Sequence, residues 1–152
     1  MVRKVKIGII QSKISDNTQS NIILAIKSIK KAESKKAKII CVPELFLSTY
    51  FCQTESHSNF KLAEKIPGRI TKIFSDLAKE LGVILILSLF EKKTSGFYHN
   101  TSIVINEVGK ILTKYRKMHI PDDPGYYEKF YFTPGDLGFK SVKTKFGRIG
   151  PL

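Results

Sequence analysis

Residues 114–136 read KYRKMHIPDDPGYYEKFYFTPGD, and the rest of the chain is organised around them. The residues from Asp122 to Gly125 supply turn chemistry, which fixes a loop without a helix or a strand. The aromatic residues that follow are expected to dock this loop on a core, because disordered loops are poor in aromatics. A docked loop keeps water from its charged groups, and such charges are reactive. We therefore expect a functional loop with no secondary structure of its own.

Three apolar runs precede this loop and are typical of buried strands. They cover residues 5–11, 38–42 and 83–89. The first is nearly all apolar apart from Lys6, so we expect it to be buried on both faces near the centre of a sheet. Pro43 ends the second run and leaves Glu44 at the carboxyl end of a strand, the edge where ligands bind in open α/β sheets.

Helices and a hairpin are predicted between and after these strands. Apolar residues recur at helical spacing at about 17–34 and again at 68–81, where Gly82 is placed to end the helix. Residues 97–105 and 110–115 are rich in β-branched side chains and flank a glycine-containing turn, which predicts a hairpin. The expected order is strand, helix, strand, helix and then three strands, in one α/β domain.

The composition and the net charge indicate which classes of binding partner are expected. The chain has 152 residues, 42% of them hydrophobic, which suits one domain with an ordinary core. Its net charge of +13 at pH 7 raises nucleic acid as a partner. However, 22 lysines stand against four arginines, and readers of nucleic acid favour arginine for bidentate contacts. The densest basic run, residues 27–38, is typical of a solvated helix face. We therefore expect no nucleic-acid partner.

Membrane and metal partners are also not expected. The sequence has no apolar run near the roughly 20 residues that span a bilayer. Its two cysteines, Cys41 and Cys52, lack the CxxC or Cys/His spacing of a structural zinc site. This use of cysteine suits a reducing compartment, so the expected location is the cytoplasm.

Three charged residues suggest chemistry: Glu44 after one strand, Lys117 after another and Glu128 in the loop. A carboxylate held near a lysine in a partly buried site can act as a general base, while the ammonium stabilises an oxyanion. A glutamate after a strand is also typical of a solvated end or a cap, so spacing alone leaves both interpretations open. Spacing alone also supplies no nucleophile.

The motifs resemble one family. VPELF at 42–46, GKILTKYRKMHIP at 109–121 and EKFYFTPGD at 128–136 resemble the carbon-nitrogen hydrolase (nitrilase) superfamily, in that order and at suitable spacing. SLFEK, GFYHNT and DDPGYYEKFYFTPGD are similar to a narrower group of its amidases, which hydrolyse a carbamoylated polyamine to putrescine, carbon dioxide and ammonia. The resemblance implies the first half of a four-layer α-β-β-α sandwich, with residues 1–152 as a single incomplete domain.

The resemblance also implies roles for single residues. Glu44 is the general base that takes the proton of a thiol, and Lys117 is the cation that stabilises the tetrahedral intermediate. Glu128 matches a second glutamate that positions the substrate and the lysine. His119 matches a residue that hydrogen-bonds behind these groups, and an ordinary loop histidine is the alternative. Arg116 is expected to be an ion-pair partner instead of a catalyst.

The substrate surroundings follow from the same resemblance. Tyr50, Phe51 and Tyr127 are expected to line the substrate channel or, alternatively, to belong to the core. The implied substrate is a small carbamoyl amine, and neither a metal nor an organic cofactor is implied. The full-length enzyme is implied to be a homo-oligomer.

The nucleophile of the resembled family is a cysteine on a sharp elbow after a strand, and that strand would begin at residues 146–150. The chain ends at Leu152, so we expect the amino-terminal portion of such an enzyme, inactive by itself. Cys41 is expected in a buried strand, where thiols are inert, and nothing in the sequence places Cys52 against Glu44. The alternative is a non-catalytic remnant or interaction module of the same fold.

Overall fold

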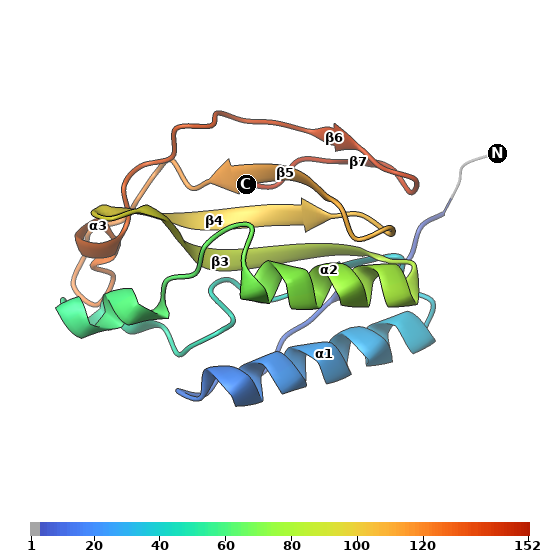
Figure 1. Cartoon of the computed structure of the whole chain (residues 1–152), viewed down its shortest axis with the longest axis horizontal. Helices are drawn as coiled ribbons and strands as arrows, with labels where there is room; N and C mark the ends of the chain where they lie inside the picture. The colour runs from blue at the N-terminus through green and yellow to red at the C-terminus, as the bar shows by residue number, and fades with distance from the viewer. Residues whose placement is uncertain (1–3) are drawn as a thin grey trace.

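The computed structural model describes residues 4–152, and its centre is a five-stranded sheet (Figure 1). The strands stand side by side in chain order: β1 (Ile7–Ile9), β2 (Ile39–Cys41), β3 (Ile84–Thr94), β4 (Phe97–Ile105) and β5 (Ile111–Arg116). The first three are parallel, and β3, β4 and β5 form an antiparallel meander that contains the predicted hairpin. Because two reversals restore the direction of β3, β5 runs the same way as β2.

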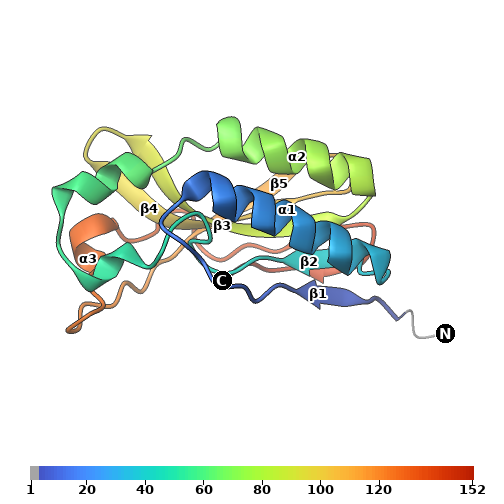
Figure 2. The ribbon, with the colours of Figure 1, turned by 90° about the horizontal axis from the view of Figure 1, so that it is seen from below.

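Two helices cover one face of this sheet, α1 (Thr18–Ser34) and α2 (Arg69–Leu81), and both confirm the predicted ranges (Figure 2). The side chain of Asn17 caps α1 by accepting a hydrogen bond from the amide of Ser20 at 2.8 Å. Gly82, with a φ of 61°, ends α2 in the left-handed conformation that glycine adopts without strain. Within residues 4–152, no helix is long and apolar enough to cross a membrane.

The main core lies between these helices and the sheet. The apolar face of α1 supplies Ile22 and Ile29, and α2 supplies Phe74, whose ring meets that of Phe46 edge-on with centroids 5.4 Å apart. Each large apolar side chain that is fully buried in this way contributes about 1.5–3 kcal/mol to folding. The helices therefore hold the sheet, and the ends of its strands, in one fixed arrangement.

A short hairpin covers part of the other face of the sheet. Its strands, β6 (Val142–Lys143) and β7 (Arg148–Ile149), form a two-stranded sheet of their own. The strand expected to begin within residues 146–150 is therefore present as β7, but it lies in this hairpin. Apolar side chains of the hairpin pack against those of the main sheet: Val142, Phe146 and Ile149 meet Ile39, Ile84 and Val104.

The prediction that the first strand lies near the sheet centre, buried on both faces, is wrong. β1 is an edge strand and pairs with β2. Gly8 and Ile10 face the helices, whereas Ile7 and Ile9 on the opposite face are 61% and 84% exposed. An apolar run shows that both faces of a strand suit burial, but within residues 4–152 no element covers this face of β1.

A second, smaller core is made of aromatic residues and docks the loop of residues 114–136, as expected. Its buried rings are those of Phe51, Phe90, Tyr131 and Phe132. Phe51 belongs to the 3-10 helix η1 (Phe51–Gln53), and a second 3-10 helix, η2 (His57–Leu62), packs alongside. The rings of Phe51 and Phe90 stack with centroids 5.0 Å apart, which adds to the stabilisation from buried area.

The same loop is not free of secondary structure, and that expectation is corrected. It contains α3 (Glu128–Tyr131), a helix too short for a periodic apolar pattern to reveal. The expected turn is present, because the amide of Tyr126 donates to the carbonyl of Asp123 at 2.7 Å and Gly125 has a φ of 81°. Turn and helix together place Glu128 inward, where it is 3% exposed.

Candidate active site

Glu44, Lys117 and Glu128 meet at one edge of the sheet, as the roles implied for them require. The ammonium nitrogen of Lys117 lies 2.8 Å from Glu128 Oε2 and 3.5 Å from Glu44 Oε1. Glu44 follows β2 and Lys117 follows β5, and these strands run in the same direction, so their carboxyl ends share an edge. Glu128 is brought to the same edge by α3.

Both oxygens of the buried Glu128 carboxylate are engaged. Its Oε1 accepts a hydrogen bond from the hydroxyl of Tyr50 at 3.0 Å, and its Oε2 accepts one from Lys117. Burial and then the negative charge of Glu128 raise the pKa of Tyr50, so this hydroxyl stays protonated and donates. A carboxylate held in this way is suited to anchoring the lysine.

The charge of Lys117 is maintained by its neighbours. Burial alone would lower the pKa of the ammonium, because a charged group loses solvation. The hydrogen bond to Glu128 and the charge of Glu44 outweigh burial and raise the pKa above its ordinary value. The Glu44 side chain is 58% exposed. The arrangement thus places a permanent cation beside an accessible carboxylate, as a general-base site with oxyanion stabilisation requires.

Two of the three charged residues, Glu44 and Lys117, line a cavity of about 430 Å³. Glu44 and Lys117 lie on its wall beside Ser88 of β3 and Asn100 of β4. The rest of the lining consists of Cys41, Val42, Ile86, Leu87, Ser102, Tyr115, Gly150, Pro151 and Leu152. A mostly apolar wall with a few polar groups at one place is typical of a small-molecule site.

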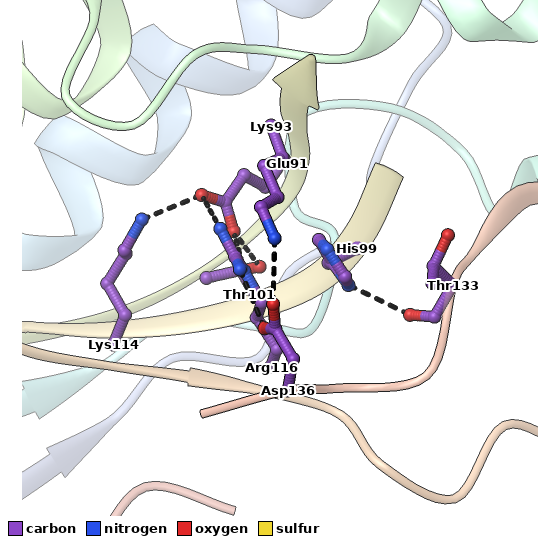
Figure 3. Close-up of polar contacts among 8 residues, drawn as sticks. All are labelled: Glu91, Lys93, His99, Thr101, Lys114, Arg116, Thr133 and Asp136. Carbon is purple, nitrogen blue, oxygen red and sulfur yellow. Dashed lines mark hydrogen bonds and ion pairs between the residues drawn. The ribbon is translucent and has the colours of Figure 1, made fainter. Parts of the chain in front are cut away.

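A buried ion network fixes β5 directly before Lys117 (Figure 3). Arg116 binds Glu91 through Nε and Nη2 at 2.7 and 2.8 Å, and it binds Asp136 through Nη1 at 2.7 Å. Lys114 adds a further contact to Glu91 at 2.7 Å. The expectation that Arg116 is an ion-pair partner is confirmed. Glu91 was not among the predicted site residues, although it directly follows an apolar run in the sequence.

The network keeps Glu91 charged although this residue is 2% exposed. Burial alone would raise the pKa of Glu91, but hydrogen bonds from Arg116 and two neighbours outweigh burial and lower the pKa to about 2. On the other side of β5, the amide of Gly135 donates to the carbonyl of Lys117 at 2.9 Å. A Cβ atom at Gly135 would overlap the carbonyl oxygen of Arg116, so the two segments approach as closely as glycine allows.

His99 of β4 lies next to this network and is 1% exposed. Its Nδ1 is 2.9 Å from the carbonyl oxygen of Thr133 and must donate, because a carbonyl oxygen only accepts. Burial lowers the pKa of His99, so its ring is neutral and Nε2 carries no proton. Within residues 4–152 this Nε2 has no hydrogen-bond partner. His99 thus ties the segment after α3 to β4 and does not reach the three charged groups.

The other predicted site residues lie in different surroundings. His119 is exposed and lines a separate surface hollow that does not include Glu128. Tyr50 touches Glu128, and Phe51 lies in the aromatic core. Tyr127 is half-buried and precedes α3 as its N-cap residue. Among the residues that the structure describes, the lining of the 430 Å³ cavity includes none of these aromatics.

The two thiols are poorly placed for nucleophilic attack. Cys52 is fully buried, and burial followed by the charge of Glu128 raises its pKa to about 12. Cys41 lines the cavity, but burial raises its pKa as well. Both thiols are therefore protonated at neutral pH, where only the thiolate is a nucleophile. Residues 4–152 contain no cluster of three or more His, Cys, Asp or Glu side chains that could hold a metal ion.

A lysine that lies between two carboxylates at the edge of an α/β sheet is an arrangement that suits general-base chemistry. The family model described as Carbon-nitrogen hydrolase matches residues 6–152, and the chain therefore belongs to this family.

Two relatives of known function are similar to almost the whole chain. N-carbamoylputrescine amidase of Arabidopsis thaliana is 43% identical over 149 residues, which cover 97% of this chain and 50% of that protein. Citrullinase of Francisella tularensis is 37% identical over 147 residues, which cover 96% of this chain and 51% of that protein. The chain thus spans about half the length of these relatives.

A solved structure gives the same result. The crystal structure of a carbon-nitrogen hydrolase from Helicobacter pylori G27 matches with a TM-score of 0.91 at 42% identity, covering 96% of this chain and 50% of that one. The expected fold class is confirmed: the chain has a nitrilase-like α/β fold and supplies one sheet and one helix layer of an α-β-β-α sandwich.

Proposed function

We propose that the chain is the amino-terminal part of a thiol-dependent amidase that hydrolyses N-carbamoylputrescine or a similar carbamoyl amine. The observation that carries this proposal is the convergence of Glu44, Lys117 and Glu128 at one sheet edge, where Glu44 and Lys117 line a cavity. The names of the relatives support the substrate class, since N-carbamoylputrescine and citrulline both end in a ureido group. Hydrolysis of N-carbamoylputrescine gives putrescine, carbon dioxide and ammonia. This reaction is a step of polyamine biosynthesis.

In the proposed reaction, a thiol adds to the ureido carbon while the carboxylate of Glu44 takes the thiol proton. The carbonyl oxygen becomes an oxyanion, which the ammonium of Lys117 stabilises. The adduct collapses, and ammonia leaves with the proton from Glu44. Water, deprotonated by Glu44, then releases the thiol and a carbamate, which loses carbon dioxide to give the amine.

Glu128 holds Lys117 in this scheme and takes no proton. Its two oxygens accept hydrogen bonds from Tyr50 and Lys117, so both are already engaged. The Glu44 side chain, 58% exposed, is the carboxylate that a substrate can reach. In this scheme Glu128 therefore anchors the Lys117 ammonium, and Glu44 transfers the proton.

The proposal includes a thiol that this chain does not supply. Cys41 and Cys52 both have raised pKa values, and Cys52 is fully buried. We therefore place the nucleophile in the half of the relatives that this chain does not match. The 152-residue chain alone is expected to release ammonia from N-carbamoylputrescine at the background rate.

Complementation tests this proposal. The chain is co-expressed with the half of the Helicobacter pylori relative that it does not match, and ammonia release is measured. We expect activity from the pair that is lost in Glu44→Gln and in Lys117→Ala, whereas Glu55→Gln and Lys13→Ala, at exposed positions, leave it unchanged.

Two outcomes would contradict the proposal. Turnover by the chain alone that disappears in Cys41→Ser or Cys52→Ser would make one of these thiols the nucleophile. A soluble pair without any activity would favour a non-catalytic remnant of the same fold.

A further inference from the structure

Asn100 of β4 contacts both Glu44 and the main chain of Lys117. It is 4% exposed. Its side-chain Nδ2 donates to Glu44 Oε1 at 2.6 Å, and its main-chain oxygen accepts a hydrogen bond from the amide of Lys117 at 2.9 Å. A single residue thus contacts both the carboxylate and the segment that carries the cation.

The orientation of the Asn100 amide is set from behind by Ser88 of β3. The Ser88 hydroxyl accepts a hydrogen bond from the amide of Leu45 at 3.1 Å, so its proton is free to point to Asn100 Oδ1, 3.4 Å away. With its oxygen turned to Ser88, the amide presents its NH₂ group to Glu44. Leu45, the residue after Glu44, has a φ of 49°, which a non-glycine residue holds only when its surroundings fix it.

Glu44 depends on this support more than Glu128 does. The Lys117 ammonium is 2.8 Å from Glu128 but 3.5 Å from Glu44, so the lysine is held mainly by the buried carboxylate. Within residues 4–152, the Glu44 side chain has only Asn100 and Lys117 as partners. An exposed carboxylate without a short hydrogen bond turns toward water, where it is better solvated.

We infer that Asn100 is a positioning residue that holds the Glu44 carboxylate beside Lys117. The role of Glu44 in catalysis rests on the proposed function, but the clamp itself is a property of this chain. It acts through Glu44 and does not require contact between Asn100 and the substrate.

The clamp is tested by NMR titration of the Lys117 ammonium in the 152-residue chain. Asn100→Ala releases Glu44, so the pKa of Lys117 is expected to fall to the value in Glu44→Gln. In the double variant Glu44→Gln with Asn100→Ala, the pKa of Lys117 should fall no further than in Glu44→Gln alone, because the Glu44 carboxylate through which Asn100 acts is absent. A matched control is Thr101→Val, which removes a buried hydrogen bond to Glu91 from the next residue of β4 and should leave the pKa of Lys117 unchanged.

A second measurement needs no change at Asn100. The NH₂ resonances of Asn100 should shift in Glu44→Gln and stay in place in Glu55→Gln. Unshifted resonances in Glu44→Gln would overturn the inference. An unchanged pKa of Lys117 in a folded Asn100→Ala variant would also overturn it. The same holds for a pKa of Lys117 that is lower in the double variant Glu44→Gln with Asn100→Ala than in Glu44→Gln alone.

Kinetics separate this inference from the proposed function. In the complemented pair, Asn100→Ala should lower kcat about 10- to 100-fold with a much smaller effect on KM, since a misplaced base slows proton transfer. Absence of activity in the parent pair would count against the amidase proposal alone, and the NMR measurements would still decide the role of Asn100.

Discussion

The ammonium group of Lys117 lies between two carboxylates that differ in exposure. Glu128 is buried and has both oxygens engaged, whereas Glu44 is open to the cavity. Burial raises the pKa of the Cys52 thiol, and the charge of Glu128 adds to this effect, whereas for Lys117 the neighbouring carboxylates outweigh burial and raise the pKa. The chemistry of this edge is therefore set by where its charges are buried.

The two thiols provide a prediction at this scale. Cys41 lines the cavity and Cys52 is 0% exposed with a pKa of about 12. At neutral pH, iodoacetamide should label Cys41 slowly and Cys52 only when the chain unfolds. Mass spectrometry of Cys41→Ser and Cys52→Ser, each with one remaining thiol, measures the two rates. Equal rates in the folded chain would show that Cys52 is accessible.

Single residues were predictable where a motif carried them. Glu44, Lys117 and Glu128 each stand in a recognisable stretch, and the structure brings them together. Asn100 and Glu91 were not predicted as site residues, although GFYHNT and SLFEK contain them, because their side-chain partners come from other segments of the chain. His119 stood beside Lys117 in the sequence, but its side chain is exposed elsewhere.

Among the elements, β3 shows how ion pairs extend a strand. The apolar run predicted a strand at 83–89, but β3 continues through charged residues to Thr94. Glu91 can lie in the sheet because Arg116 and Lys114 of β5 meet it across β4. The network joins three strands, and its charges are satisfied within the sheet.

Removal of the central carboxylate tests this network. Glu91→Gln leaves the buried Arg116 without its main partner and should lower the free energy of unfolding by about 3–5 kcal/mol at neutral pH. The pKa of Glu91 in the folded chain is about 2, below its ordinary value of 4.5. Its contribution to stability is therefore complete above about pH 4.5 and is lost as the pH falls toward 2.

Urea unfolding at a series of pH values measures both effects. The parent chain should lose stability between about pH 4.5 and 2, and Glu91→Gln should lose less in this window. Glu55→Gln, at an exposed position, serves as the control and should behave like the parent chain. A parent-like free energy of unfolding for Glu91→Gln would refute the structural role of the network.

Most elements were predictable because their signals are local. The cap at Asn17, the glycine that ends α2 and the periodic apolar faces all act within a few residues. The place of β1 was not predictable, since strand order depends on what packs beside the strand. The helix α3 was hidden because four residues make only one turn.

The whole molecule has two unequal faces. Helices α1 and α2 cover one face of the sheet (Figure 2), and the β6–β7 hairpin covers part of the other. Ile7 and Ile9 of the edge strand remain 61% and 84% exposed. An apolar edge strand with free backbone groups is a template for association.

We therefore expect the 152-residue chain to self-associate despite its net charge of +13. Ile9→Lys should shift sedimentation toward the monomer, because a lysine on an edge strand opposes pairing. The matched control is Ile23→Lys, which changes an isoleucine that is 58% exposed on α1. A parent chain that stays monomeric at all concentrations, or an equal effect of both variants, would exclude the β1 edge as the contact.

The close approach of Gly135 to Arg116 has a genetic consequence. Every other amino acid carries a Cβ, which would occupy the space of the Arg116 carbonyl oxygen. Any missense change in this codon must therefore push β5 away from the segment that donates to the Lys117 carbonyl. Gly135 does not line the cavity, yet a side chain at this position would displace the end of the strand that leads to Lys117. An allele with a substitution at Gly135 would change the position of Lys117 without changing a residue of the cavity wall.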